Sequence, residues 1–159
     1  MLPSVSIDLM QIQPFQEQHR AAVITLWQTC GLTRPWNDPG ADIDRALTNV
    51  ASDILLSFDD GKLIGTVMVG YEGHRGWVYY LAADPGRRGE GIGRNLMTVA
   101  EDWLRDRGCP KILLMVRDSN HAVRRFYENL GYDHQNVTAL GRWLIDPPVP
   151  QGDLDKTKG

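Results

Sequence analysis

The sequence predicts an α/β protein in which a mixed, mostly antiparallel sheet is flanked by helices. Short apolar runs between turn residues predict strands, and two of these runs flank the hairpin signal at residues 59–62 (DDGK). Apolar residues at helical spacing predict helices before and after them. A strand, a long helix and another strand follow one another in the middle of the chain, which is typical of a right-handed crossover.

The predicted order of elements is β-α-α-β-β-β-α-β-α-β-β. The first strand alternates apolar and polar residues, and the strand before the long helix is apolar enough to be central in the sheet. The next strand is short and apolar, and a final pair is expected near the end of the chain. The expected strands are residues 7–14, 54–58, 63–71, 77–83, 112–116, 132–136 and 138–145.

The helices are predicted from apolar faces and from end signals. Gly31 ends the first helix, and Asp38 followed by Pro39 is an N-cap with proline at the first helical position. Gly108 ends the third helix and Gly131 the fourth, which residues 118–120 cap. The four faces are Val23, Leu26, Trp27 and Cys30; Ile43, Leu47 and Val50; Ile92, Leu96, Val99, Trp103 and Leu104; and Val123, Phe126, Tyr127 and Leu130.

Length and composition fit one ordinary globular domain of 159 residues, with 42% apolar and 23% charged residues. We expect this domain to span residues 1–146, followed by a proline-rich polar tail at 147–159. The net charge of −3 does not favour nucleic acid or an anionic membrane as a partner. No apolar run is long enough to span a bilayer, and residues 1–10 lack the basic start of a signal peptide. Cys30 and Cys109 lie in no metal or redox motif, so we expect reduced thiols in a cytoplasm.

A glycine- and arginine-rich loop at residues 87–94 (RRGEGIGR) is the strongest local signal for a ligand. The backbone N–H groups at a helix start lack intrahelical partners, and the helix dipole is positive there. Glycines let several of these groups point into one concavity, which suits a pyrophosphate. Arg88 and Arg94 add positive charge to this loop.

Two nucleotide-binding patterns do not match this loop. The dinucleotide fingerprint needs a third glycine where Arg94 stands, and no Gly-Lys-Ser/Thr of a P-loop is present. A glycine-rich turn without a ligand remains the alternative, and the sequence shows no metal-ligand cluster.

A more specific resemblance follows from three blocks in order. Arg88-x-x-Gly91-x-Gly93 matches the (Arg/Gln)-x-x-Gly-x-(Gly/Ala) signature of the GNAT acetyltransferases. Residues 81–85 (LAADP) look like the strand end and turn that precede this signature, and residues 119–132 (SNHAVRRFYENLGY) are similar to the family's second motif. The resemblance covers residues 7–145, is sharpest over 77–132, and extends to small stand-alone bacterial members. It implies the GNAT fold and an N-acetyltransferase that uses acetyl-CoA.

The resemblance assigns a cofactor-binding role to the loop and to the strand before it. Arg88 would open the turn, and the strand would splay from its neighbour, pair with the pantetheine arm and point an N–H at the thioester carbonyl. Asn120 would contact the cofactor arm, or it caps a helix. Tyr127 would give a proton to the departing thiolate, or it is a core aromatic. The strand residues are Leu81, Ala82 and Ala83, and the loop amides are those of Gly89, Glu90, Gly91, Ile92, Gly93 and Arg94.

The general base departs from the family pattern. The family's glutamate on the strand before the second motif corresponds to Met115, and residues 77–83 contain no carboxylate. Glu72 is our first candidate for the base. His74, Asp118, His121 and a base acting through water remain alternatives.

The acceptor groove of this superfamily is built by the first two helices, their loop and the later hairpins. Here Arg34, Trp36 and Asn37 would recognise a polar amine, or they form a rigid turn with Trp36 in the core. The amine would belong to a small molecule, a peptide N-terminus or a lysine. The alternative function is an acyl-CoA-binding regulator or sensor. Members often dimerise through the last strands, here residues 138–145, so a homodimer is also implied.

Overall fold

The computed structural model describes residues 10–151. The chain divides into two compact units, of which the first holds residues 1–33 and 39–114 and the second holds residues 34–38 and 115–159. The expected division into a domain at 1–146 and a tail at 147–159 stays a prediction. Most of that tail, and residues 7–9 of the first expected strand, lie outside the described residues.

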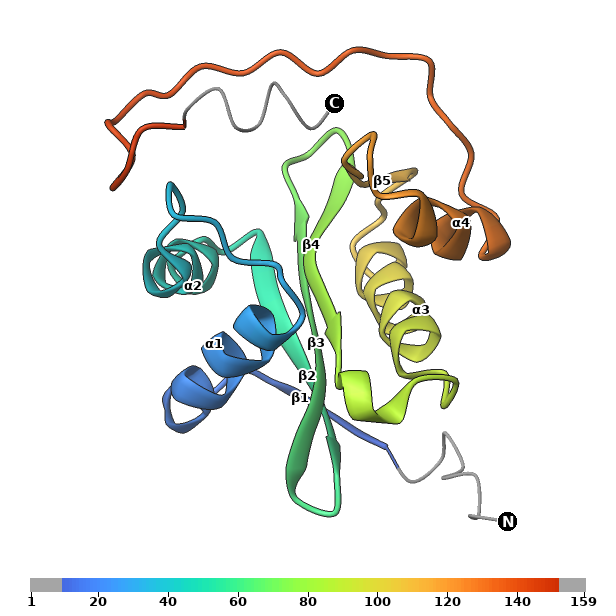
Figure 1. The fold of residues 1–159 in the computed structure, drawn as a ribbon. Coiled ribbons are helices and arrows are strands. Elements are labelled where there is room, and N and C mark those ends of the chain that lie inside the picture. Colours follow the sequence, from blue (N-terminus) through green and yellow to red (C-terminus); the bar gives the residue numbers. More distant parts are fainter. Residues whose placement is uncertain (1–9, 152–159) are drawn as a thin grey trace. The chain divides into compact units, whose positions relative to one another are not determined.

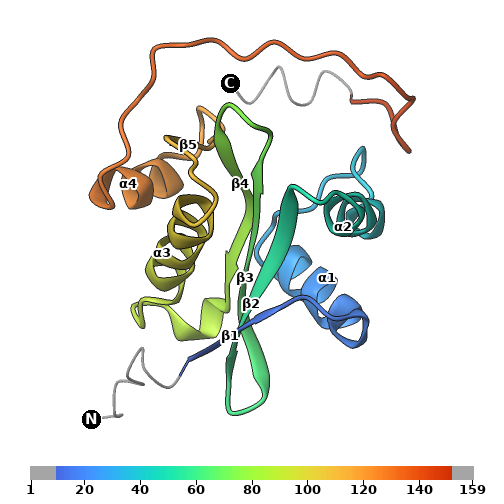
Figure 2. The ribbon, with the colours of Figure 1, turned by 180° about the vertical axis from the view of Figure 1, so that it is seen from behind.

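The first unit contains a sheet of five strands in the order β1-β2-β3-β4-β5. The first four strands pair antiparallel, and β5 pairs parallel with β4, which confirms the predicted mixed, mostly antiparallel sheet. Figures 1 and 2 show α1 and α2 on one side of this sheet and α3 on the other. The strands are β1 (Gln11–Pro14), β2 (Ser52–Asp59), β3 (Lys62–Tyr71), β4 (Gly76–Ala83) and β5 (Ile112–Leu113). The helices of this unit are η2 (Glu17–His19), α1 (Arg20–Thr29), α2 (Pro39–Thr48), η3 (Pro85–Arg87) and α3 (Ile92–Arg105).

One face of the sheet packs against α1 and α2. The buried core on this side includes residues of α1 and α2 together with alternate residues of β2. For α2 the predicted apolar face was right at Ile43, which is buried, and wrong at Leu47 and Val50. Leu47 is 38% exposed, and Val50 lies beyond the helix end with its side chain in solvent. Ala46 completes the buried face, since it lies three residues after Ile43 on the side that meets the sheet.

The other face packs closely against α3. Its buried side chains are Ile92, Leu96, Met97, Ala100 and Leu104. Two glycines of the sheet allow this approach. A Cβ added at Gly65 would lie 2.7 Å from Leu96 Cδ1, and one added at Gly76 would lie 2.6 Å from Leu104 Cδ1. The helix is therefore held against the sheet at both of its ends, which fixes the start of α3 relative to β3 and β4.

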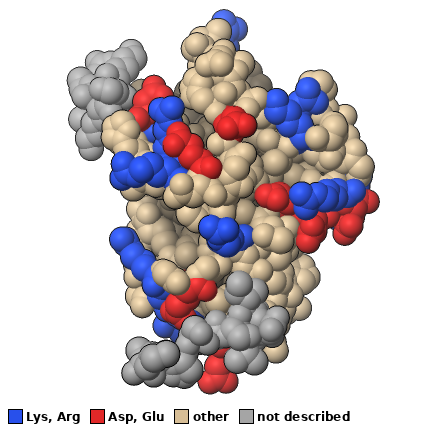
Figure 3. Space-filling view, turned by 90° about the vertical axis from the view of Figure 1, so that its right-hand side faces the viewer, with Lys and Arg blue, Asp and Glu red and all other residues tan. Residues whose placement is uncertain are grey.

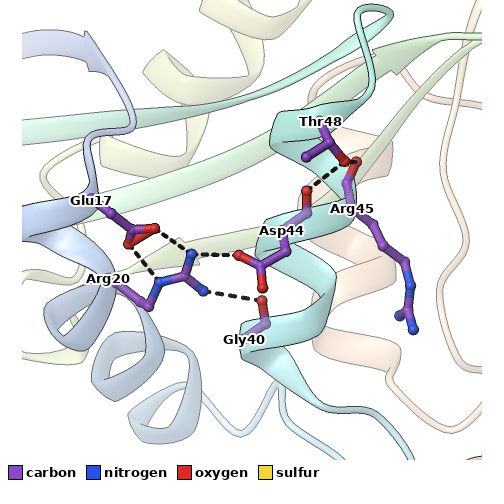
Figure 4. A network of polar contacts seen from close by, with 6 residues as sticks. All are labelled: Glu17, Arg20, Gly40, Asp44, Arg45 and Thr48. Carbon is purple, nitrogen blue, oxygen red and sulfur yellow. Dashed lines mark hydrogen bonds and ion pairs between the residues drawn. The ribbon is translucent and has the colours of Figure 1, made fainter.

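An arginine joins the starts of α1 and α2. Arg20 donates hydrogen bonds to Glu17 and to Asp44, and its Nη1 donates to the carbonyl of Gly40 at 3.1 Å (Figure 4). The two carboxylates hold the pKa of Arg20 above its usual range. Asp44 of α2 thus connects the two helices. Asp42 of the same helix instead accepts a hydrogen bond from the Tyr80 hydroxyl.

The second unit contains α4 (His121–Asn129). Asn120 Oδ1 accepts a hydrogen bond from the Val123 N–H at 3.2 Å, which confirms the predicted cap. Gly131, at φ 95°, follows the helix and ends it as predicted.

The prediction of strands at residues 132–136 and 138–145 is wrong, because residues 132–145 are described and pair with no strand. Its apolar side chains stay in solvent, with Leu140 94% and Leu144 91% exposed. A strand is stable only with a ladder partner and with one side buried, and here three consecutive apolar residues at 143–145 also break the alternation. The dimer contact expected on residues 138–145 stays a prediction.

Candidate active site

The edge of β4 that faces β5 is open over most of its length. β5 pairs with β4 only through Gly76↔Ile112 and Trp77↔Leu113, so no described strand pairs with this edge of residues 78–83. The strand expected at residues 112–116 was therefore too long. A bulge bends and twists the strand that carries it, and β4 has such a bulge. Unpaired backbone groups along an open edge can pair with an extended ligand.

The bulge of β4 lies at Tyr80 and Leu81. Thr66 pairs with Ala82 and Met68 pairs with Tyr79, so two residues of β4 oppose one residue of β3. Tyr80 has a φ of 50° in the left-handed region, where a residue other than glycine costs about 1–2 kcal/mol. Strain of this kind persists only where the surroundings fix it, and it is frequent at functional sites.

The glycine-rich loop leaves the start of α3 uncapped. Asp84 begins the loop, and its Oδ1 accepts a hydrogen bond from the Gly86 N–H at 2.9 Å. Gly89 and Gly91 then take φ values of 82° and 80°, which only glycine adopts without strain. Gly91 is the N-cap of α3 and provides no side-chain acceptor, so the first N–H groups of this helix remain available to an anion.

Glu90 of this loop is neutralised by Arg87 of the same loop. Arg87 pairs with Glu90 Oε1 at 2.9 Å and with Asp59 Oδ2 at 2.8 Å. The pKa of Arg87 is held above its usual range by the two carboxylates, and the hydrogen bond from Arg87 lowers the pKa of Glu90. Arg87 therefore connects the loop to the end of β2 and masks a charge that would repel a phosphate.

Arg88 and Arg94 differ from Arg87. Both are exposed, and the described part of the chain offers neither side chain a hydrogen bond or an ion pair. On the face shown in Figure 3, acidic and basic side chains adjoin in several places, and some basic side chains have no acidic neighbour. Arg88 and Arg94 are therefore the two loop arginines able to neutralise a bound anion.

Glu72, the first candidate for the base, is held in a turn. Its Oε1 accepts hydrogen bonds from the N–H groups of His74 and Arg75, which close the connection between β3 and β4. The bond from Arg75 is the main cause of a lowered pKa of Glu72. A lowered pKa makes the carboxylate a weaker proton acceptor than an ordinary glutamate.

Tyr127 of α4 lies within an aromatic group of the second unit. Its ring packs edge-on against Phe126, at 5.1 Å between centroids, and against Tyr132, at 5.8 Å. Burial raises the pKa of Tyr127 to about 12. The side chain therefore packs as an aromatic residue and also keeps its hydroxyl proton at any physiological pH.

The other candidates of the second unit are exposed or lie in a turn. Asp118 and His121 are exposed. Arg34, Trp36 and Asn37 are half-buried, and the Asn37 N–H donates to the Arg34 carbonyl at 3.0 Å. This forms the turn that the sequence predicted, and contact with an acceptor stays a prediction.

Four residues around the bulge were missed by sequence reasoning. Trp27 Nε1 donates to Thr66 Oγ1, and Thr66 Oγ1 donates to the Tyr80 carbonyl, both at 2.9 Å. Tyr80 in turn donates to Asp42 Oδ2 at 2.6 Å. The only signal in the sequence was Thr66, a polar residue in a strand that is otherwise apolar. Nothing in the sequence indicated which residues it contacts.

The described residues, 10–151, offer no support for two other kinds of site. None of their helices is both long and apolar enough to cross a membrane. Within the same residues, no three His, Cys, Asp or Glu side chains are grouped closely enough to hold a metal ion. The loop before α3 and the open edge of β4 therefore remain the best-supported candidate site.

The fold and the loop together define a family. The model described as the acetyltransferase (GNAT) family matches residues 19–132, which is most of the chain. The protein therefore belongs to the GNAT acetyltransferase family, in agreement with the resemblance in its motifs.

Solved structures of similar fold cover most of this chain. A transcriptional regulator from Bacillus halodurans C-125 matches 84% of this chain and 99% of its own, at 17% identity and a TM-score of 0.73. The aminoglycoside N-acetyltransferase AAC(6')-Iy, in complex with the bisubstrate analogue CoA-S-monomethyl-acetylneamine, matches 86% of this chain and 99% of its own, at 16% identity and a TM-score of 0.72. A ribosomal-protein-alanine N-acetyltransferase from Brucella melitensis biovar Abortus 2308 matches 84% and 99%, at 21% identity and a TM-score of 0.68. At these identities the likeness shows the fold alone.

Proposed function

We propose that this protein transfers an acetyl group from acetyl-CoA to a primary amine. One observation carries the proposal: an uncapped helix start with two left-handed glycines follows directly after a bulged strand with an open edge. The first feature suits a pyrophosphate and the second suits an extended amide chain, and CoA contains both. Family membership supports acetyl transfer as the reaction.

The residues of the first unit fit CoA by charge and by shape. The amides of residues 89–94 would hold the pyrophosphate, with Arg88 and Arg94 as counter-charges. The backbone edge of Leu81, Ala82 and Ala83, which pairs with no described strand on the β5 side, would pair with the pantetheine amides. When bound, acetyl-CoA supplies a thioester as the acyl donor. The Leu81 N–H would donate to the thioester oxygen, where negative charge develops.

Two further residues, Tyr127 and Glu72, would transfer protons, and Asn120 would contact the cofactor. Tyr127 would donate a proton to the sulfur of the departing thiolate. Its raised pKa keeps the phenol protonated before the reaction, and also makes the phenol a weaker acid than an ordinary tyrosine. Asn120 would contact the cofactor arm with its side-chain N–H₂, because its Oδ1 is already used as the cap of α4. Glu72 remains our candidate for taking up the proton of the amine through water, and as an exposed carboxylate of lowered pKa it would release that proton to solvent.

The acceptor is an amine of a small molecule, a peptide N-terminus or a lysine. Proteins of similar fold act on an aminoglycoside in one case and on a ribosomal-protein alanine in another, by their descriptions. Arg34, Trp36 and Asn37 would contact this acceptor. We place the reaction in the cytoplasm, where Cys30 and Cys109 would stay free thiols, as the structure has them. A homodimer remains part of the proposal.

A regulator or sensor that binds acyl-CoA is the second candidate function. Two observations favour it: a protein of similar fold is described as a transcriptional regulator, and the lowered pKa of Glu72 makes it a weak base. Such a protein would bind acetyl-CoA without turnover.

The first test is calorimetry of the purified protein with acetyl-CoA and, as a control, with NAD. We expect micromolar binding of acetyl-CoA and none of NAD, followed by release of the CoA thiol in the presence of members of an amine panel. Binding without thiol release would support the sensor. Absence of acetyl-CoA binding would overturn both functions.

We expect the change Arg87→Gln to weaken acetyl-CoA binding about tenfold, which is 1.4 kcal/mol. The change frees the carboxylate of Glu90 beside the amides that would hold the pyrophosphate. The double change Arg87→Gln with Glu90→Gln removes the repulsion and should recover most of the affinity. Calorimetry at one ionic strength measures both.

The matched control is Arg105→Gln, which removes an arginine that pairs with Glu101 and Asp102 at the opposite end of α3. Its affinity for acetyl-CoA should equal that of the unchanged protein. An equal loss in both single variants would contradict a local role of Arg87.

A further inference from the structure

The bulge of β4 holds a tyrosine where this type of bulge usually has glycine. Tyr80 is the only residue of β4 with a positive φ, at 50°, and it directly precedes Leu81 in the chain. Glycine adopts such a φ freely, whereas a tyrosine must be held there. The contacts that hold Tyr80 therefore decide which way the next peptide group points.

The first contact acts on the backbone of Tyr80. Thr66 Oγ1 donates to the Tyr80 carbonyl at 2.9 Å, and the same oxygen accepts from Trp27 Nε1 at 2.9 Å. Thr66 and Trp27 are both 0% exposed. Water does not reach this hydroxyl and cannot compete for its hydrogen. The indole N–H of Trp27 occupies one lone pair of Thr66 Oγ1, which leaves the hydroxyl hydrogen directed at the Tyr80 carbonyl.

The second contact acts on the side chain of Tyr80. Its ring stacks on Trp27, with 3.7 Å between centroids and 11° between planes. Its hydroxyl donates to Asp42 Oδ2 at 2.6 Å. Residues of α1, α2 and β3 thus hold Tyr80 at both ends, and we refer to Trp27, Asp42 and Thr66 as the Tyr80 clamp.

The direction of one N–H follows from the geometry of the peptide bond. In a trans peptide the carbonyl of one residue and the N–H of the next lie in one plane and point in opposite directions. Since the Tyr80 carbonyl points at Thr66, the Leu81 N–H points away from Thr66. Thr66 belongs to β3, and the opposite edge of β4 at this position has no strand partner in the described chain.

We propose that Thr66 is a positioning residue for acetyl transfer: its hydroxyl fixes the peptide between Tyr80 and Leu81 so that the Leu81 N–H faces the thioester oxygen. This inference rests on the proposed function. The rest of the Tyr80 clamp supports the same orientation through the tyrosine side chain. Thr66 is 0% exposed, so its hydroxyl would not reach a bound cofactor or amine and would act only through the backbone of β4.

The test compares Thr66→Val, which keeps the shape and removes the hydroxyl, with Thr66→Ser, which keeps the hydroxyl. We expect Thr66→Val to lower kcat for thiol release 10- to 100-fold and to leave the Kd for acetyl-CoA within about twofold, because the pyrophosphate loop is untouched. Thr66→Ser should restore kcat to within about threefold. A general loss of stability would not produce this split between kcat and Kd.

Ser57→Ala is the matched control, because it removes a buried hydroxyl from the neighbouring strand β2. Ser57 is 0% exposed, and its Oγ has no hydrogen-bond partner among the described residues. We expect its kcat and Kd to equal those of the unchanged protein. Equal kcat values in Ser57→Ala and Thr66→Val would overturn the proposal.

A spectroscopic readout separates this inference from the proposed function. In protein labelled with ¹⁵N-leucine, acetyl-CoA should shift the Leu81 amide proton downfield, and Thr66→Val should abolish most of that shift. If the unchanged protein neither binds nor turns over acetyl-CoA, the proposed function fails. If it does both and Thr66→Val keeps the full shift and kcat, only the positioning role fails.

A second variant keeps the test decisive should Thr66→Val not fold. Tyr80→Phe keeps the ring stacked on Trp27 and removes only the hydroxyl that donates to Asp42. We expect a 3- to 10-fold lower kcat with unchanged Kd. An unchanged kcat in this variant would show that the Tyr80 hydroxyl does not help to orient this peptide, and would overturn the part of the proposal that concerns the side chain of Tyr80.

Discussion

The change Gly91→Val is expected to reduce acetyl-CoA binding at least 100-fold while the protein stays folded. Gly91 has a φ of 80°, which valine cannot adopt without strain, so the peptide before α3 would rotate and its N–H groups would leave the concavity. A Cβ at this position meets no atom within 4 Å, so packing is not disturbed. Calorimetry measures the affinity, and urea denaturation measures the remaining stability.

Gly108→Val is the matched control for this prediction. Gly108 follows the other end of α3, has a φ of 73°, and likewise leaves a Cβ free of contacts within 4 Å. The two changes should therefore cost similar stability, on the order of 1–2 kcal/mol. Affinity close to that of the unchanged protein is expected for Gly108→Val. Unchanged affinity in Gly91→Val would remove the glycine-rich loop from the cofactor site.

The loop and the hairpin of this protein were predictable because their signals are local. Residues 59–62 place Asp60 and Gly61 at positive φ, as a tight hairpin turn requires, and β2 and β3 formed on either side. Gly89 and Gly91 likewise take the left-handed conformation, which fits the turn that the glycine-rich loop predicted before the helix. Each of these features depends on a few adjacent residues, so the sequence states it directly.

The bulge and its clamp were not predictable, since they depend on residues far apart in the chain. Trp27 and Thr66 are 39 positions apart, and Asp42 and Tyr80 are 38 apart. Nothing near Tyr80 in the sequence marks it as left-handed, because tyrosine is an ordinary strand residue. The surroundings, rather than the local preference of tyrosine, set the conformation.

Residues 132–145 show the opposite error, in which a local pattern was given too much weight. Apolar residues at 138–145 suggested a strand, yet no partner strand pairs with them in the described chain. The deciding factor was the availability of hydrogen-bond partners, which a sequence does not list. For Glu72 the sequence likewise did not show that the N–H groups of the following turn bond to its carboxylate, and its role as the base stays a prediction.

The structure supports the proposed cofactor-binding residues better than the proposed proton-transfer residues. The open edge of β4, its bulge and the start of α3 all belong to the first unit, where α3 packs closely on the sheet. Rigid packing of this kind suits electrostatic stabilisation, because donors must not reorient during the reaction. The proposed proton donor, Tyr127, belongs to the second unit, so its role needs a kinetic test.

The change Tyr127→Phe is expected to lower kcat 10²- to 10⁴-fold, the usual contribution of a general acid, and to change the KM for acetyl-CoA by less than about threefold. Phenylalanine keeps the edge-on contacts with Phe126 and Tyr132 and loses only the proton that would go to the departing thiolate. Tyr132→Phe makes the same chemical change on a neighbouring ring and should retain nearly full kcat. An equal kcat in Tyr127→Phe and the unchanged protein would remove Tyr127 as the acid.

The raised pKa of Tyr127 predicts how the stability of the protein and its kcat change with pH. The pKa of Tyr127 is raised to about 12, above the value near 10 of a tyrosine in an unfolded chain. The folded protein therefore retains this proton longer than the unfolded chain, and stability that depends on it falls as the pH rises from about 10 to 12. Below pH 10 the phenol stays protonated, so any fall of kcat at pH 8–9 must come from another group. Such a fall should affect Tyr127→Phe and the unchanged protein equally. We therefore expect the ratio of their kcat values to stay constant up to about pH 10.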